Sequence, residues 1–179
     1  MRNTVSPSPV RKAGRTPNRL TIGSWNLEGM TDLKLHKICT YMKLHSIDIL
    51  CIQETRKINS DKYLSDDGCT VLLSGSGESC REWAGVGFVI SARADRCVIG
   101  FRPLSNRIAC LKLRVAGGTL ALFTTLAPHN LRPLPEKAAF YDELDQAVQV
   151  VRANGPTYIF GDLNARLGQR RPGEPRPSR

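Results

Sequence analysis

The chain is organised around residues 156–165, which read PTYIFGDLNA. Its apolar run, residues 158–160, lies between Asn-Gly-Pro and a glycine, and this length and composition predict a short buried strand. Asp162 and Asn164 follow Gly161, a residue type that lets the backbone turn sharply or approach a ligand closely. Because open α/β sheets bind ligands outside the carboxyl ends of their strands, we expect these two side chains to take part in chemistry. A plain turn is the alternative, since Asp, Asn and Gly all favour turns.

A strand, a helix and a second strand are predicted at the start of the folded region. Residues 20–25 alternate in the manner of a strand and end at Asn26, whereas residues 47–52 are almost continuously apolar and lead to Glu54. Apolar residues spaced three and four apart predict a helix over about residues 31–44. A single short crossover makes the two strands parallel, so Asn26 and Glu54 are expected at the same sheet edge. A plain surface position is the alternative for Glu54, because exposed glutamates are common.

The rest of the chain is predicted to contain mainly strands and one further helix. The expected strands cover residues 69–73, 85–90, 97–101, 108–115 and 120–126. A Gly-Gly turn joins the last two as an antiparallel hairpin. The polar segment 57–67 is predicted to be a loop, and apolar spacing predicts a helix over about residues 135–152.

Length and charge indicate one folded domain between two basic tails. The chain has 179 residues, of which 41% are hydrophobic, and no apolar stretch is long enough to cross a membrane. Residues 1–19 hold five basic residues and no acid, and residues 169–179 hold four arginines and one glutamate, so the tails carry +8 of the formal charge of +10. We therefore expect a disordered basic leader, a folded domain at residues 20–168 and a disordered basic tail. Such tails can hold polyanions loosely, without selecting a sequence.

The six cysteines form no motif. None belongs to a Cys-x-x-Cys pair or lies beside a histidine array, which argues against zinc. No apolar signal-peptide core precedes them, so we expect buried or idle thiols in a reducing compartment, either nuclear or cytoplasmic. No pattern in the sequence indicates an oligomeric state.

Four polar residues follow predicted strand ends, and their types indicate a metal. Asn26, Glu54, Asp162 and Asn164 supply carboxylate and carboxamide oxygens, with no histidine or cysteine cluster. Oxygen donors suit a hard divalent cation that retains waters for a phosphate substrate. The expected cofactor is Mg²⁺, with Mn²⁺ as the alternative.

These residues lie within an ordered set of motifs. The set comprises Trp25-Asn26, Glu28-Gly29-Met30, residues 49–55 (ILCIQET), residues 85–88 (GVGF), Arg107-Ile108, Ala127-Pro128 and residues 161–165 (GDLNA). In this order it resembles the endonuclease/exonuclease/phosphatase superfamily. Within that superfamily it is most similar to the apurinic-type endonuclease domains of non-LTR retrotransposons and the craniofacial development protein 2 group. The resemblance covers residues 20–168.

The resemblance implies a four-layer α/β sandwich, in which two mixed sheets pack face to face with helices outside. It also implies hydrolysis of phosphodiesters with magnesium, and a retroelement-derived DNA endonuclease is the first interpretation. Glu54 would ligate the metal and Asn26 would support the metal and the phosphate. Asp162 would position or deprotonate the attacking water, while Asn164 would orient the phosphate and stabilise its developing charge. The neighbours of Glu54 that we expect to bind substrate are Gln53, Thr55 and Arg56.

Two departures from the family pattern bear on activity. Leu126 stands where the family has a tyrosine, so a phenol expected near the phosphate is missing. The closing strands with their Ser-Asp-His motif are also absent, and we expect a second sheet that is incomplete at the C-terminus and a chain that is inactive alone. Two alternatives remain open: a phosphatase or lipid phosphodiesterase of the same superfamily, and a non-catalytic remnant that binds nucleic acid weakly.

Overall fold

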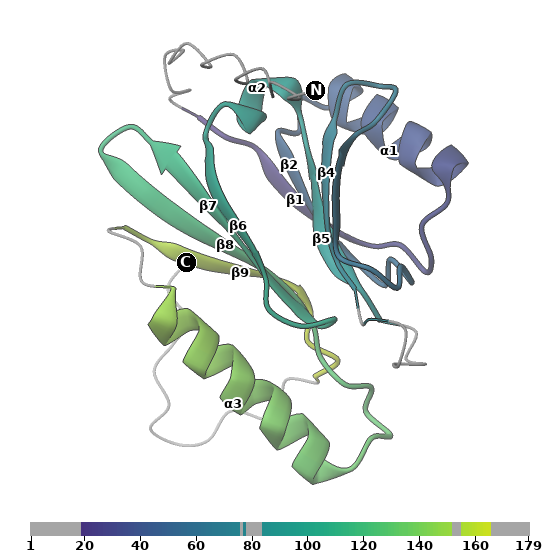
Figure 1. Cartoon of the computed structure of the whole chain (residues 1–179), viewed down its shortest axis with the longest axis vertical. Coiled ribbons are helices and arrows are strands. Elements are labelled where there is room, and N and C mark those ends of the chain that lie inside the picture. The colour runs from purple at the N-terminus through teal and green to yellow at the C-terminus, as the bar shows by residue number, and fades with distance from the viewer. Residues whose placement is uncertain (1–18, 76, 78–83, 152–154, 166–179) are drawn as a thin grey trace, which may run out of the picture.

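Two β-sheets pack face to face, and a helix covers the outer face of each (Figure 1). The computed structural model describes residues 19–75, 77, 84–151 and 155–165. Its layers are helix α1, a five-stranded sheet, a four-stranded sheet and helix α3. The predicted four-layer α/β sandwich is therefore confirmed. The predicted leader and tail lie almost wholly outside the described residues.

The first sheet has the strand order β1-β2-β5-β4-β3. Its strands are β1 (Ile22–Asn26), β2 (Ile49–Gln53), β3 (Asp61–Leu64), β4 (Thr70–Ser74) and β5 (Val86–Ile90). β1 and β2 are parallel, as the single crossover requires, and the other pairs are antiparallel. Helix α1 (Asp32–Leu44) forms this crossover, and its N-terminal cap Thr31 accepts a hydrogen bond from the Lys34 N–H.

The second sheet has the order β6-β7-β8-β9. Its strands are β6 (Val98–Pro103), β7 (Ile108–Val115), β8 (Gly118–Leu126) and β9 (Thr157–Asp162). β7 and β8 form the predicted antiparallel hairpin, whereas β9 runs parallel to β8 after helix α3 (Leu134–Val150). A short helix, α2 (Ala92–Asp95), connects the two sheets along the chain and was not predicted.

Three apolar clusters hold the layers together. The cluster between the sheets includes Cys51, Phe88 and Leu122, all fully buried. A second cluster packs α1 against the first sheet through Leu35, Ile38 and Met42, and a third packs α3 against the second sheet. Burial of apolar side chains on both faces of β2 explains its continuous apolar sequence.

Two expectations about strands were wrong. The segment 57–67 is not wholly a loop, because β3 pairs with β4 at the far edge of the first sheet. Its sequence, DKYL, is polar because an edge strand faces solvent. β9 is not buried either. Among the described residues its one paired neighbour is β8, and Tyr158 and Ile159 are 48% and 47% exposed.

The described cysteines are buried, as expected. Cys39, Cys51, Cys69, Cys97 and Cys110 are free thiols inside the fold. Burial raises the pKa of Cys51, in the middle of β2, to about 12, which keeps this thiol protonated and unreactive at neutral pH. Cys80 lies outside the described residues. None of the helices that the structure describes is long and apolar enough to span a membrane.

Candidate active site

The carboxyl ends of three strands meet at one end of the sandwich. β1 ends at Asn26, which lies opposite Gln53 at the end of β2, so Glu54 follows at the same edge. In the second sheet, β9 ends at Asp162 and contacts both β1 and β2 across the sandwich. The prediction that Asn26 and Glu54 share a sheet edge is therefore confirmed, and Asp162 joins them from the other sheet.

The carboxamide of Asn26 joins the two carboxylates of the site. Its nitrogen Nδ2 donates to Glu54 Oε1 at 2.8 Å and lies 3.5 Å from Asp162 Oδ2. Its oxygen Oδ1 accepts from the backbone N–H of Glu28 at 3.2 Å. A carboxamide has two N–H donors, so one side chain can hold a carboxylate from each sheet. The strand ends of both sheets thereby become one polar cluster.

The backbone around this cluster takes an unusual conformation. Glu28, Glu54, Arg56 and Asn164 all have φ between 45° and 54°, the left-handed region that non-glycine residues rarely adopt. Each such residue costs on the order of 1–3 kcal/mol, so surrounding contacts must hold it in place. The backbone N–H of Gly29, for example, donates to the Glu54 carbonyl at 2.7 Å. Backbone strain of this kind is concentrated at functional sites.

Gln53 and Thr55 lie beneath the site. Each is 1% exposed. Gln53 Nε2 donates to Thr124 Oγ1 at 2.9 Å, and this bond connects the two sheets directly behind the carboxylates. A Cβ atom on Gly85, whose φ is 105°, would lie 2.3 Å from Thr55 Oγ1, so this position requires glycine. Their predicted contact with substrate stays a prediction, and the geometry favours support of Glu54 from below.

Arg56 is the accessible member of the predicted substrate-binding group. Its side chain is 39% exposed, and Nη2 lies 3.7 Å from Glu54 Oε2. A Cβ atom on Gly29 would lie 3.3 Å from Arg56 Cδ, so the glycine lets the arginine pass close to the loop after β1. The guanidinium thus stands beside the site, where it can pair with a phosphate.

Asp162 and Asn164 are coupled by the turn after β9. The backbone N–H of Asn164 donates to Asp162 Oδ1 at 2.9 Å, so both oxygens of this carboxylate have a partner. The Asn164 Nδ2 donates to the Ala127 carbonyl at 2.8 Å. Gly161 has φ of 148°, and a Cβ atom there would lie 1.9 Å from the Thr125 carbonyl oxygen. The glycine before the carboxylate is therefore needed for β9 to reach the site.

Leu126 brings no polar group to the position where a tyrosine was expected. It lies opposite Asp162 in the parallel register of β8 and β9 and is 4% exposed, within the core between the sheets. Its carbonyl accepts from Arg107 Nη1 at 3.2 Å, and its N–H donates to the Arg107 carbonyl. The side chain at this position is therefore apolar packing directly beside the site.

Two supporting residues were missed by sequence reasoning. Thr124 accepts from Gln53 and donates to the Ile52 carbonyl at 3.3 Å, so it completes the connection between the sheets. A polar residue within the apolar run of residues 120–126 was the signal in the sequence that could have identified it. Lys34, in the first turn of α1, donates from Nζ to the Gly29 carbonyl at 2.7 Å and holds the loop that follows Asn26.

The donor set of the site consists of oxygen atoms. In the part of the chain that the structure describes, no three His, Cys, Asp or Glu side chains gather closely enough to hold a metal ion. The site offers the carboxylate oxygens of Glu54 and Asp162, and the Asn26 carboxamide donates its N–H groups to both. Mg²⁺ is commonly bound through one or two carboxylates and keeps several waters for the phosphates of a substrate. This donor set therefore fits Mg²⁺.

The four-layer α/β sandwich thus gathers carboxylates and carboxamides where the strands of both sheets end. The Endonuclease/Exonuclease/phosphatase family matches residues 23–178, so the chain belongs to this family. Craniofacial development protein 2 of Tragulus javanicus is 27% identical over 147 residues, which are 82% of this chain and 25% of that protein. The chain thus spans about a quarter of the length of the curated relatives it matches.

Solved structures share the fold. The 3′ phosphatase NExo from Neisseria, bound to product DNA hairpin, is similar with a TM-score of 0.62 and 17% identity, over 82% of this chain and 58% of that chain. An AP endonuclease from Leishmania major is similar with a TM-score of 0.53 and 19% identity, over 79% and 54% of the two chains. At these identities the likeness shows the fold alone.

Proposed function

We propose that this chain is part of a divalent-metal-dependent phosphodiesterase domain whose substrate is DNA. The observation that carries the proposal is the Asn26 carboxamide, which joins Glu54 from the first sheet to Asp162 from the second. Paired carboxylates held by donors at strand ends are suited to binding a divalent cation and a phosphate together. The motif set, which resembles retrotransposon endonuclease domains, supports DNA as the substrate and a retroelement origin.

The residues divide the chemistry between them. Glu54 would hold Mg²⁺, or Mn²⁺ in its place, and Asn26 would support the metal by holding the two carboxylates together. When bound, the ion supplies positive charge for the phosphate oxygens. Asp162 accepts the proton of the attacking water, with its carboxylate oriented by the Asn164 N–H and by Asn26. The Asn164 side chain gives one N–H to the Ala127 carbonyl, which leaves the second as a donor to the phosphate.

We further propose that the 179 residues bind metal and DNA without being a competent nuclease. The proposed base Asp162 ends β9, whose one paired neighbour among the described strands is β8. None of the three histidines makes a hydrogen bond or an ion pair with Glu54 or Asp162 within the described residues. His36 pairs with Asp67, His45 packs against Tyr41, and His129 lies on the exposed loop after β8. Because no imidazole is hydrogen-bonded to the site, proton transfer to the leaving group lacks a positioned acid.

The test is the effect of magnesium on DNA affinity. Mg²⁺ competes with basic side chains for phosphates and so weakens purely electrostatic binding. A metal held at Glu54 has the opposite effect, and we expect Mg²⁺ to tighten binding of a fluorescein-labelled duplex about fivefold at constant ionic strength, measured by anisotropy. The Glu54→Gln variant should lose this gain.

The matched control is Glu143→Gln, the same change on α3, away from the site. It should keep the gain in affinity. Weaker binding with Mg²⁺ in the unsubstituted protein, or an equal gain in Glu54→Gln, would contradict the proposal. Incubation with supercoiled plasmid and Mg²⁺ should give no nicking above that of Glu54→Gln, whereas Glu54-dependent nicking would show that the 179 residues suffice for catalysis.

A further inference from the structure

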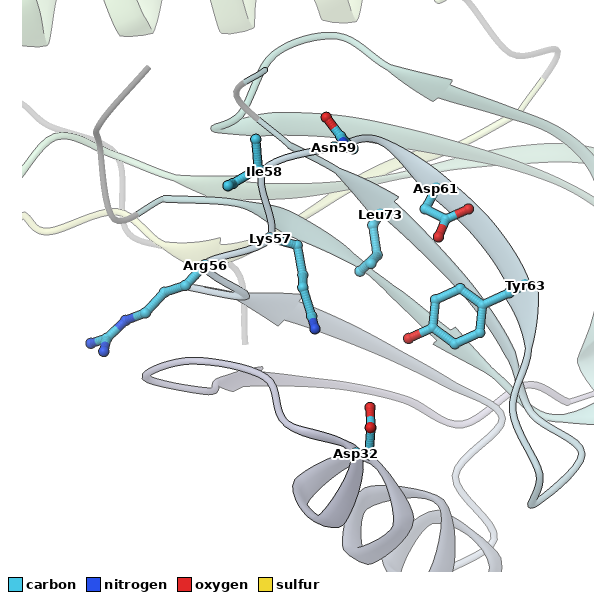
Figure 2. Close-up of a pocket in the computed structure, with 8 residues that line it drawn as sticks. All are labelled: Asp32, Arg56, Lys57, Ile58, Asn59, Asp61, Tyr63 and Leu73. Atoms are coloured by element: carbon cyan, nitrogen blue, oxygen red, sulfur yellow. The ribbon is translucent and has the colours of Figure 1, made fainter. Parts of the chain in front are cut away.

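A polar pocket adjoins the proposed metal site on the outer side of the first sheet. It has a volume of about 560 Å³ and lies between the loop after β2, the first residue of α1, and strands β3 and β4 (Figure 2). The lining residues are Asp32, Arg56, Lys57, Ile58, Asn59, Asp61, Tyr63 and Leu73. Arg56 is shared between this pocket and the site, because its guanidinium turns away from the pocket and lies 3.7 Å from the Glu54 carboxylate.

Three polar groups face this pocket from three different elements. Lys57 directs its ammonium toward the middle of the pocket, the Asp32 carboxylate faces it from α1, and the Tyr63 hydroxyl faces it from β3 (Figure 2). Within the described residues, none of these three side-chain groups makes a hydrogen bond or an ion pair. A cation and an anion that line one pocket without pairing leave room for a ligand that satisfies both.

Tyr63 and Leu73 are apolar residues beside these groups. Tyr63 is half-buried and Leu73 is fully buried at the base of the pocket. Burial, together with the negative charges of Asp32 and Asp61, raises the pKa of Tyr63, so its hydroxyl stays a hydrogen-bond donor at neutral pH. An aromatic ring beside hydrogen-bonding groups is the usual environment for an unstacked nucleobase.

We propose that this pocket binds an unstacked guanine next to the phosphate held at Glu54; this proposal rests on the proposed action on DNA. The Asp32 carboxylate matches the two neighbouring donors of guanine, N1–H and the 2-amino group. The Lys57 ammonium matches the acceptors O6 and N7, and the Tyr63 ring offers a stacking surface. Hypoxanthine lacks only the 2-amino group of guanine, so it tests the contact of this group with Asp32. Thymine has no amino group and no N7, so it also tests the contact of N7 with Lys57.

The experiment measures anisotropy of labelled duplexes in Mg²⁺, each with one unpaired base that is guanine, hypoxanthine or thymine. The unsubstituted protein should bind the guanine duplex about tenfold more tightly than the thymine duplex, with hypoxanthine between them. Lys57→Met should remove most of this preference, and Asp32→Asn should make guanine and hypoxanthine equivalent.

The control is Lys62→Met, which removes the same charge from β3 between two pocket residues. Side chains alternate along a strand, so Lys62 points away from the pocket that Asp61 and Tyr63 line. It should weaken binding of all three duplexes alike and keep the preference. Thermal melting confirms that both lysine variants are folded.

The outcomes separate this proposal from the function of the site. Equal affinities for the three bases, or an equal loss of preference in Lys57→Met and Lys62→Met, would overturn the guanine pocket while the magnesium effect at Glu54 stands. Retention of the guanine preference in Glu54→Gln supports the pocket as a separate recognition element. A magnesium effect that is absent in the unsubstituted protein would instead remove the proposed function.

Discussion

β2 and β9 both lead into the same site, but they are anchored very differently. β2 lies between β1 and β5, and every one of its residues is buried. β9 has β8 as its one paired neighbour in the described part of the chain, and Tyr158 and Ile159 remain about half exposed. The ligand candidate Glu54 therefore follows a rigid central strand, whereas the base candidate Asp162 ends an edge strand.

This difference shows which half of the site is held by the core. Glu54 lies between two buried residues, Gln53 and Thr55, and its side chain accepts a hydrogen bond from Asn26. Asp162 depends on Asn26 and on the short turn to Asn164. Local openings of a protein are drawn from its least buried elements, so motion at this site is expected on the β9 side.

The largest expected effect comes from matched isoleucine substitutions in the two strands. Ile52 in β2 is fully buried, whereas Ile159 in β9 is 47% exposed. Ile52→Ala should lower the free energy of unfolding by about 4 kcal/mol, because it leaves a cavity against α1, and Ile159→Ala by less than about 1 kcal/mol. Urea unfolding followed by circular dichroism measures both. Equal losses would show that β9 is as firmly packed as β2.

The sequence predicted β2 and its surroundings better than it predicted β9. A continuous apolar run, a Thr31 cap and a single crossover together determine a parallel pair, and the structure contains it. The apolar run of β9 has the same character, but a run cannot show how many strands pair with it. Burial of β9 was therefore predicted wrongly, and β3 was missed because a polar edge strand lacks alternation.

The residues of the site were predicted from the sequence, but their hydrogen-bond partners were not. Strand ends and residue types indicated Asn26, Glu54 and Asp162, which the structure brings together. The substrate contact expected of Gln53 stays a prediction, and the structure adds a hydrogen bond from its side chain to Thr124 in the other sheet. The pairing partner of a buried amide depends on the packing of the sheets, which the local pattern does not contain.

A second, smaller effect is expected at the connection between the sheets. Gln53→Leu should cost about 2 kcal/mol, because it removes the donor to Thr124 Oγ1 inside the core. The double variant Gln53→Leu with Thr124→Val should recover part of that loss, since neither partner of this hydrogen bond is left unpaired, although the Ile52 carbonyl then loses the Thr124 donor. Chemical denaturation of the single and double variants measures the coupling. Additive losses would mean that the hydrogen bond does not connect β2 to the second sheet.

The smallest change in stability is expected at the side of β9 that pairs with no strand among the described residues, and a larger change is expected in the association of chains. An unpaired apolar edge favours association of chains, and a lysine on the edge opposes it. Ile159→Lys should alter the free energy of unfolding by less than about 0.5 kcal/mol while lowering the apparent mass in light scattering. Leu64→Lys is the control, because β3 is the polar edge of the other sheet and Leu64 is also exposed. An unchanged apparent mass in Ile159→Lys would place association elsewhere.

Mn²⁺ binding tests the proposed metal site most directly. It is measured from the electron paramagnetic resonance signal of the free ion. We expect the unsubstituted chain to bind Mn²⁺ at Glu54, and Glu54→Gln to weaken that binding by at least about tenfold. Glu143→Gln, on α3, should bind as the unsubstituted chain does. Binding that is equally tight in Glu54→Gln would contradict the assignment of a metal site to the ends of β1, β2 and β9.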